Sequence, residues 1–346
     1  MESSSGLEQG NDLDAKPTVC FLGPVSSYTH QATLDTFPTD KFDFLPVDTI
    51  KVTPPPPRGN KDIFDTTQSG RAACGIVPFE NSTNGSVVFT LDQIADRAGE
   101  YPDLAVCAEI YLDVHHCLVG HHHHHHHSHH LDLTHVRRVY SHPQAFGQCT
   151  KFLREKLRGV ETVDVSSTSR AAALAKDDAT GASAAISSAA AAQMLGLDVL
   201  ARNVEDREDN TTRFFVVRRG GAAIPGLEEV LSKRRRRRQG TGGDGDGDGD
   251  SDSDIYSQSK SLASFTVPHR SPGALADVLE CFRRARLNLT SINSRPSLAQ
   301  PFQYVFFVEF EGHRLRDPEG RVRDALASVA AVAQSCRWWG SWDNMR

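Results

Sequence analysis

Polar side chains that could bind an anion or pass a proton gather at residues 203–217. This stretch reads Asn-Val-Glu-Asp-Arg-Glu-Asp-Asn-Thr-Thr-Arg-Phe-Phe-Val-Val, so acids, amides, hydroxyls and an arginine directly precede a short apolar strand at 214–217. The polar ends of strands in open α/β sheets commonly carry ligand chemistry. An ordinary loop entering an edge strand explains the same pattern, and composition alone favours that simpler interpretation.

Three other polar stretches also follow apolar segments. Residues 80–85 (Glu-Asn-Ser-Thr-Asn-Gly) lie between an expected strand at 75–79 and a helix with apolar spacing at 87–98. Ser141 and Gln144 have capping-box spacing, which predicts Ser141 as a helix N-cap. Ser167 and Thr168 start a third helix. Helix N-termini bind carboxylates, so Ser141 and Gln148 could reach a cleft, although plain capping explains Ser141 equally well.

Composition limits the classes of protein to consider. The chain has 346 residues, 38% hydrophobic and 24% charged, which indicates a globular protein of two or three domains. The net charge of −6 gives no indication of a nucleic-acid partner. No stretch is long and apolar enough for a membrane span, and the N-terminus has no secretory apolar region. Seven scattered cysteines without a Cys-x-x-Cys pair indicate reduced thiols and a cytoplasmic location.

Short strands alternating with helices predict an α/β fold. Further strands are expected at 18–22, 42–47, 136–140 and 184–186, extended chain at 105–119, and helices at 26–37, 143–157 and 187–196, the last ending at Gly196. From residue 163 to 169 the chain begins another such unit, a strand and a hydroxyl-rich loop before an Ala-rich helix.

Low-complexity stretches interrupt this pattern. Residues 1–16 are expected to be a disordered tail, and residues 220–260 a linker, because arginine blocks and Gly-Asp repeats cannot build a core. Residues 54–57 read as a proline-rich insertion. The His-rich run 121–130 reads as a loop, with a metal site as the less favoured interpretation. The basic block at 233–238 has a nuclear signal or RNA patch as its minor alternative.

The C-terminal segment, 261–346, predicts a βαββαβ module of the ferredoxin-like type. Ser271 and Pro272 are expected to start its first helix as cap and first helical residue. Expected strands and helices follow at 263–267, 287–292, 304–310, 322–334 and 336–342.

Five motifs in one order resemble the prephenate dehydratase family, in the monofunctional form with a C-terminal ACT regulatory domain. They are Gly23-Pro24 with residues 28–32 (Tyr-Thr-His-Gln-Ala), residues 75–82 (Gly-Ile-Val-Pro-Phe-Glu-Asn-Ser), residues 141–149 (Ser-His-Pro-Gln-Ala, then Gln148-Cys149), Ser167-Thr168, and the Thr212-Arg213-Phe214 triplet. The resemblance covers residues 17–219 and 260–346. It implies a two-lobed, periplasmic-binding-protein-like catalytic domain at 17–219, with the active site between the lobes.

The resemblance implies decarboxylating dehydration of prephenate to phenylpyruvate in phenylalanine biosynthesis, with no cofactor and no metal. Thr212 would donate a hydrogen bond or proton to the departing hydroxyl, and the other implied catalytic residues are Glu80, Asn81, Ser141 and Gln148. Implied substrate contacts come from Ser27, Tyr28, Ser82, Ser167, Thr168, Arg213 and Phe214. For Arg213, an internal salt bridge is the equal alternative.

The same resemblance implies that L-phenylalanine binds the ACT domain at a subunit interface as a feedback inhibitor, in a homodimer or homotetramer. The implied effector residues are Gly273, Ala274, Leu275, Asn288, Leu289, Asn293, Ser294, Arg295 and Pro296. The family usually has Glu where this chain has Asn293, and a lost carboxylate weakens a contact to the effector's ammonium group.

Two rival interpretations remain at this stage. Arogenate dehydratase acts on a substrate that differs only in a side-chain amino group, and the sequence separates the two poorly. A non-catalytic sensor of aromatic amino acids is a rival from another class. The intact stretch 210–214 argues against the sensor, because a sensor does not need Thr212.

Overall fold

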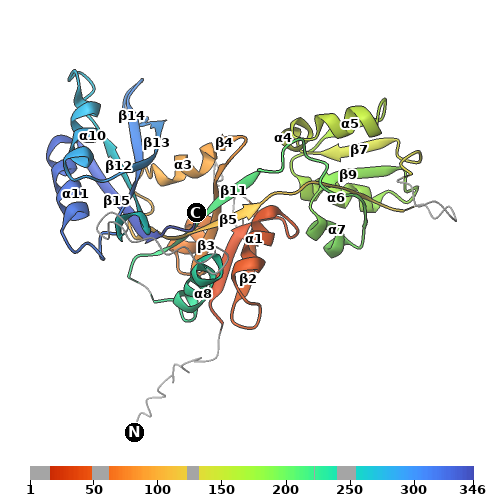
Figure 1. Ribbon diagram of the computed structural model, residues 1–346, viewed down its shortest axis with the longest axis horizontal. Helices are drawn as coiled ribbons and strands as arrows, with labels where there is room; N and C mark the ends of the chain where they lie inside the picture. Colours follow the sequence, from red (N-terminus) through yellow and green to blue (C-terminus); the bar gives the residue numbers. More distant parts are fainter. Residues whose placement is uncertain (1–15, 49–61, 123–131, 222, 240–254) are drawn as a thin grey trace, which may run out of the picture.

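A computed structural model describes residues 16–48, 62–122, 132–221, 223–239 and 255–346. They form two α/β lobes and a C-terminal domain (Figure 1). The tail 1–15, the proline-rich insertion, most of the His-rich run and the Gly-Asp repeats lie outside the described residues. No helix in the described part is long and apolar enough to cross a membrane.

The first lobe is built on a sheet of order β2-β1-β3-β11-β5, with the short strand β4 paired to β3. β11 runs antiparallel to both β3 and β5, whereas β1 pairs in parallel with β2 and β3. The strands are β1 (Thr18–Leu22), β2 (Asp43–Val47), β3 (Cys74–Asn81), β4 (Gly85–Ser86), β5 (Leu104–Asp113) and β11 (Thr211–Arg219), and the helices are α1 (Tyr28–Thr36), α2 (Ile63–Gln68), α3 (Val88–Ile94) and α8 (Leu227–Gln239).

The second lobe has a five-stranded sheet of order β10-β6-β9-β7-β8. Its strands are β6 (Cys117–Gly120), β7 (Arg138–Ser141), β8 (Glu161–Asp164), β9 (Ser183–Ser187) and β10 (Asp198–Ala201), and its helices are α4 (Pro143–Gly147), α5 (Thr150–Lys156), α6 (Thr168–Asp177) and α7 (Ala189–Leu195). Small buried side chains on α6 and α7, including Ala171, Ala172, Ala191 and Ala192, allow these helices to pack close to the sheet.

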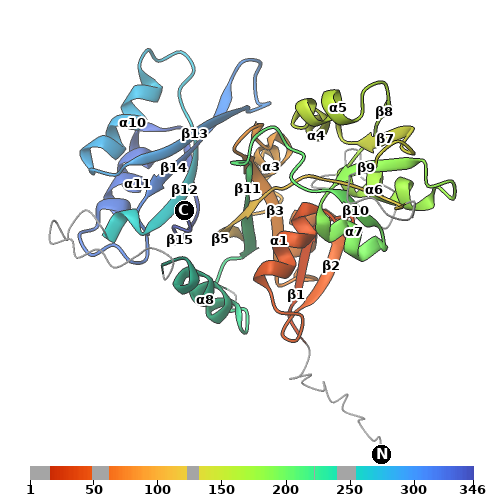
Figure 2. The same ribbon diagram turned by 45° about the vertical axis from the view of Figure 1, so that its right-hand side comes forward.

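The C-terminal domain has the predicted βαββαβ order, with an antiparallel sheet β13-β14-β12-β15. Its elements are β12 (Ser259–Thr266), α10 (Ala274–Arg284), β13 (Leu289–Pro296), β14 (Tyr304–Glu311), α11 (Arg321–Val332) and β15 (Ser335–Asp343). Both helices cover one face of this sheet, and the other face meets the first lobe (Figure 2). Trp339 and Trp342 of β15 are buried in the first-lobe core.

The predicted α/β class and the two-lobed architecture are confirmed, but some local predictions are wrong. Residues 220–260 are not only a linker, because α8 lies within them. Leu227 and Val230, three positions apart on one helical face, are buried in the first-lobe core. The helix expected at 143–157 is two helices, with the break at Gln148 and Cys149.

Two predicted helix caps are also wrong. His142, not Ser141, caps α4, since Pro143 occupies the first helical position and the His142 side chain accepts the Gln144 N–H. At α10, Gly273 with φ of 83° takes the cap position, so Ser271 and Pro272 precede the helix. The predicted stop at Gly196, with φ of 70°, is confirmed.

Candidate active site between the lobes

Two segments connect the lobes, and they lie side by side. The first leaves β5 and enters β6 through His115 and His116, and the second runs from β10 to β11 and ends at Asn210. The Val114 N–H donates to the Asn210 carbonyl at 2.7 Å, and the Val204 N–H donates to the His116 carbonyl at 2.9 Å. Side chains on these segments therefore stand at the junction of both lobes, where a two-lobed protein encloses its ligand.

Thr212 lies at this junction beside Asn81. The two residues are register partners on β11 and β3, and Asn81 Nδ2 donates to Thr212 Oγ1 at 3.0 Å. The amide orientation of Asn81 is fixed because its Oδ1 accepts the backbone N–H groups of Thr83 and Asn84, at 3.0 and 2.9 Å. A backbone N–H can only donate. Thr212 Oγ1 is therefore an acceptor within the protein, and the described residues offer no acceptor for its proton.

A chain of side-chain hydrogen bonds continues from Asn81 into the second lobe. Asn81 Nδ2 lies 2.8 Å from Asn210 Oδ1, and Asn210 Nδ2 lies 3.0 Å from Gln148 Oε1. Gln148 Oε1 also lies 2.8 Å from His116 Nε2, and His116 Nδ1 lies 2.8 Å from the Tyr28 hydroxyl. We call these six residues, including Thr212, the interlobe network. It joins α1, both connecting segments and the end of α4.

The titratable members of the interlobe network are neutral near pH 7. Burial lowers the pKa of His116 below its ordinary value, although the hydrogen bond to Gln148 and the Glu205 carboxylate oppose the shift. Burial also holds the pKa of the Tyr28 hydroxyl well above its usual range. The network can therefore orient donors without bringing a fixed charge next to Thr212.

Glu80 and Arg213 lie on the opposite face of the sheet from Thr212. They are register partners, one position along from Asn81 and Thr212, and successive side chains of a strand point to opposite faces. Arg213 Nη2 binds the Glu109 carboxylate at 2.6 Å and also binds Glu309 of the C-terminal domain. Its Nη1 lies 3.9 Å from Glu80.

These contacts correct two predictions. Arg213, with 7% of its side chain exposed, is the internal salt-bridge partner and not a substrate ligand. Glu80 belongs to the Arg213 side of the sheet, so its side chain does not lie beside the Thr212 hydroxyl, and its catalytic role stays a prediction. Phe214 is 1% exposed in the core under α1, which also removes it from the predicted substrate contacts.

Ser141 is likewise not in the interlobe network. Its hydroxyl is fully buried and donates to the Ile186 carbonyl at 2.9 Å, which ties β7 to β9. No contact in the described part of the chain joins it to Thr212. The structure thus gives Ser141 a role in the sheet of the second lobe, and the predicted proximity to Glu80 and Thr212 is not found among these contacts.

The other predicted hydroxyl residues serve local structure at the starts of helices and strands. Ser27 caps α1 by accepting the His30 N–H, and Ser167 caps α6, whose first residue is Thr168. Ser82 donates to the Asp209 carbonyl at 3.0 Å and accepts the Thr211 N–H at 2.9 Å. Ser82 therefore holds the segment leading into Thr212 against the end of β3.

The predicted effector residues divide into two groups. Gly273, Ala274 and Leu275 line a cavity of about 240 Å³ with His269, Gln303, Tyr304 and Phe306. The others lie at or next to β13, away from that cavity's lining. They include Asn288, Leu289, Ser294 and Pro296, of which Leu289 is 36% exposed.

Two side chains of the β13 group contact the first lobe of the same chain. Asn293 Oδ1 accepts the Ser86 hydroxyl at 2.7 Å, and Arg295 binds Asp92 at 2.9 Å. A single copy of the chain therefore does not bring the two groups of predicted effector residues together.

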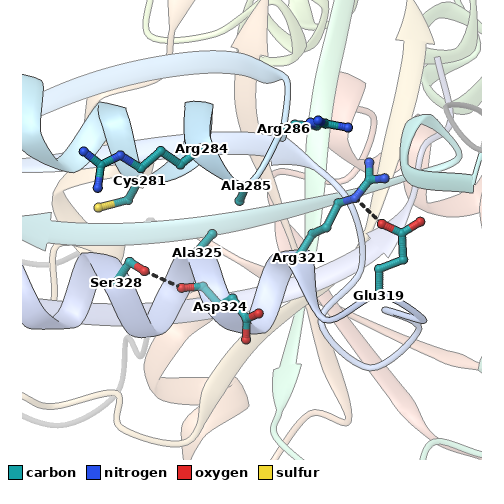
Figure 3. Close-up of a pocket in the computed structure, with 9 residues that line it drawn as sticks. All are labelled: Cys281, Arg284, Ala285, Arg286, Glu319, Arg321, Asp324, Ala325 and Ser328. Atoms are coloured by element: carbon teal, nitrogen blue, oxygen red, sulfur yellow. Dashed lines mark hydrogen bonds and ion pairs between the residues drawn. The ribbon is translucent and has the colours of Figure 1, made fainter.

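A second cavity of the C-terminal domain, of about 400 Å³, lies between α10 and α11 (Figure 3). No predicted site residue lines it. Within this cavity, Arg321 Nε binds the Glu319 carboxylate at 2.6 Å, so two of the charged side chains that line the cavity are paired with each other.

His116 and Asn210 are the residues that sequence reasoning missed. His116 lies in a stretch expected only to be extended, where a pair of histidines interrupts an apolar run. That interruption was the available signal. Asn210 directly precedes the two threonines of the motif. Both residues are 3% exposed in the structure, and a polar side chain this deeply buried requires hydrogen-bond partners.

Comparisons with known proteins give a family model, related sequences and solved structures. The family model described as prephenate dehydratase matches residues 19–222. The chain is 32% identical over 330 residues to the bifunctional chorismate mutase/prephenate dehydratase of Aquifex aeolicus, covering 95% of this chain and 74% of that protein. It is 30% identical over 332 residues to the prephenate dehydratase of Mycolicibacterium smegmatis, covering 94% and 90%. The crystal structure of prephenate dehydratase from Arthrobacter aurescens in complex with L-Phe superposes with a TM-score of 0.71 at 27% identity, covering 95% and 90%.

Proposed function

The chain belongs to the prephenate dehydratase family, and we propose that Thr212 is the residue that assists departure of the hydroxyl from prephenate. The enzyme converts prephenate to phenylpyruvate, CO2 and water. Aromatisation of the ring drives this reaction. The protein must therefore hold a dianion, assist the leaving hydroxyl and keep water from the departing carboxylate.

One observation carries the assignment of Thr212. Asn81 Nδ2 donates to Thr212 Oγ1 at 3.0 Å, and this uses the hydroxyl oxygen as an acceptor. The hydroxyl proton is then available for an external acceptor, which is what a leaving hydroxyl presents. A threonine hydroxyl is a weak acid, so we assign it a hydrogen bond that strengthens as negative charge develops on the departing oxygen.

We assign supporting roles to Asn81 and Gln148. Asn81 holds the Thr212 hydroxyl in orientation. Gln148 uses its Oε1 for two hydrogen bonds within the protein, and its amide N–H groups have no partner among the described residues. These N–H groups can donate hydrogen bonds to a carboxylate of prephenate. Ser27, Ser82, Ser167 and Thr168 remain proposed substrate contacts through the helix and strand starts that they occupy.

The test is the rate of phenylpyruvate formation, followed by ultraviolet absorbance, for the natural chain and for Thr212→Ala. Loss of one such donor predicts a fall in kcat of roughly 10²–10³-fold. Parallel assays with prephenate and arogenate measure the preference between the two substrates. A folded Thr212→Ala variant with the natural kcat on both substrates would refute the assignment.

We further propose that L-phenylalanine inhibits the enzyme by binding at Gly273, Ala274 and Leu275. The A. aurescens relative was crystallised in complex with L-Phe. The cavity beside these residues has a volume of about 240 Å³ and aromatic walls from Tyr304 and Phe306, which suit a phenyl ring. Because the β13 residues do not line it, we assign their contacts with phenylalanine to a second copy of the chain, in a homodimer or homotetramer.

We also propose a cytoplasmic location, which the seven unpaired cysteines support.

Sedimentation with and without L-phenylalanine, together with inhibition assays, tests this proposal. The expected result is an oligomer whose rate falls at phenylalanine concentrations of about 1 mM or below, the range in which enzymes commonly bind small metabolites. A purely monomeric chain that phenylalanine inhibits normally would contradict the shared site.

A further inference from the structure

We propose that His116 is a positioning residue of the dehydratase, which holds the Gln148 amide in the one orientation that directs its NH2 group to the substrate. This inference rests on the function proposed for Thr212. His116 does not need to touch the substrate for this role. It acts through Gln148 and, by way of Asn210, through Asn81 and Thr212.

The direction of the interlobe network is fixed at one end by backbone groups. The Thr83 and Asn84 N–H groups donate to Asn81 Oδ1, so the other side of that amide is its NH2 group. Asn81 Nδ2 must therefore donate to Asn210, at 2.8 Å, and Asn210 presents its Oδ1 there. The NH2 group of Asn210 is then the part that faces Gln148, at 3.0 Å.

The same logic determines the state of His116. Because Asn210 Nδ2 donates, the atom of Gln148 that receives it must be Oε1. Gln148 Oε1 also lies 2.8 Å from His116 Nε2, so this ring nitrogen must carry a proton. In the neutral ring Nδ1 is then an acceptor, and the Tyr28 hydroxyl donates to it at 2.8 Å rather than to the more distant His115 carbonyl at 3.3 Å. Each member of the chain has one consistent role.

This direction leaves two groups of protons for a ligand. The Thr212 hydroxyl proton and the Gln148 amide N–H groups have no acceptor among the described residues. If the His116 donor to Gln148 were lost, only the Asn210 NH2 group would hold Gln148 Oε1, and the Gln148 amide would be less firmly oriented toward the ligand. His116 itself is held in place, since its backbone N–H donates to the buried Glu205 carboxylate at 2.8 Å.

The experiment measures kcat and KM for prephenate with His116→Leu and His116→Gln. His116→Leu removes the donor to Gln148, and we expect kcat to fall on the order of 10-fold to 100-fold. His116→Gln supplies an amide NH2 near the position of Nε2 and should restore most of that loss. His115→Gln is the matched control on the same segment, because the His115 side chain is half exposed and outside the network, and a glutamine NH2 group can replace its hydrogen bond to Glu205. Its kcat should stay within about twofold.

A double-mutant cycle separates positioning from a general structural role. If His116 acts through the two donors, His116→Leu should cost little further kcat in a Thr212→Ala, Gln148→Ala background. Equal losses in both backgrounds, or a natural kcat in folded His116→Leu, would overturn the proposal. A natural kcat in Thr212→Ala would instead overturn the proposed function, so the two failures are distinguishable.

Discussion

Thr212 and Arg213 are consecutive residues of β11 whose side chains serve different domains. The Thr212 hydroxyl accepts from Asn81 at the junction of the two lobes, whereas the Arg213 guanidinium binds Glu309 of the ACT domain. Strand alternation produces this division, because neighbouring side chains leave opposite faces of the sheet. The candidate catalytic residue and the link to the regulatory domain are therefore joined by one peptide bond.

A buried cluster of four charged side chains links the first lobe to the ACT domain. Arg213 and Lys260 lie between Glu109 and Glu309, and each of these side chains is at most 7% exposed. The cluster is balanced, with two positive and two negative charges. Removing one partner leaves an uncompensated buried charge, which is far more costly than loss of an exposed pair.

We predict that Glu309→Ala lowers the free energy of unfolding by about 3–5 kcal/mol. The measurement is urea unfolding at pH 7, followed by tryptophan fluorescence, which reports on Trp339 and Trp342 at the same interface. Glu319→Ala is the matched control, because its pair with Arg321 is on the surface and is worth about 0–1 kcal/mol. Equal effects of the two variants would refute a structural role for the cluster.

The same cluster predicts an acid-dependent loss of stability. Burial alone would raise the pKa of Glu109, but the charges of Arg213 and Lys260 reverse the shift and hold this pKa below its ordinary 4.5. A carboxyl group with a lowered folded-state pKa stabilises the protein above its unfolded pKa. That stability is lost as pH falls through the folded pKa. We expect the free energy of unfolding to decrease below about pH 4.5.

Glu109→Gln checks this assignment, because glutamine does not titrate. Between pH 5 and pH 3, plots of unfolding free energy against pH should be less steep for the variant than for the natural chain, by up to about 1.4 kcal/mol per pH unit for one proton. Parallel plots would show that Glu109 has the same pKa in the folded and unfolded states.

Gly340 marks a close approach between the ACT domain and the first lobe. A Cβ atom at this position of β15 would lie 1.9 Å from the Val106 carbonyl oxygen, and the backbone has φ of +147°. Since a backbone atom cannot move aside cheaply, we predict that Gly340→Ala destabilises the protein by at least about 3 kcal/mol. Thermal unfolding measures the effect.

The control is Gly159→Ala, at a position with φ of +81° and open space around the Cβ. It should cost only about 1–2 kcal/mol, from the left-handed conformation. If both alanine variants unfold at the same temperature, the contact between β15 and β5 does not limit stability.

Periodicity was sufficient to predict the α/β class and the βαββαβ order of the C-terminal domain, because these depend on local patterns, whereas the two lobes and the role of Thr212 were implied by the family resemblance. The face on which a side chain lies was not predictable for Glu80 and Arg213. Both follow the register of β3 with β11, which joins residues more than a hundred positions apart. His116 was missed for a related reason: its partners Tyr28 and Gln148 come from different lobes and meet only in the folded chain.

Asn293 offers a test of how the ACT domain reaches the active site. Its Oδ1 accepts the Ser86 hydroxyl, and Ser86 pairs across β4 and β3 with Glu80, next to Asn81. If this contact carries the phenylalanine signal, Asn293→Ala and Ser86→Ala should each raise the phenylalanine concentration for half-inhibition. The double variant should then need no more phenylalanine for half-inhibition than either single variant, because both substitutions remove the same hydrogen bond. The uninhibited kcat measures any direct damage to the site. A large effect of Asn293→Ala without any effect of Ser86→Ala would instead place Asn293 against the effector itself, the role that the sequence predicts.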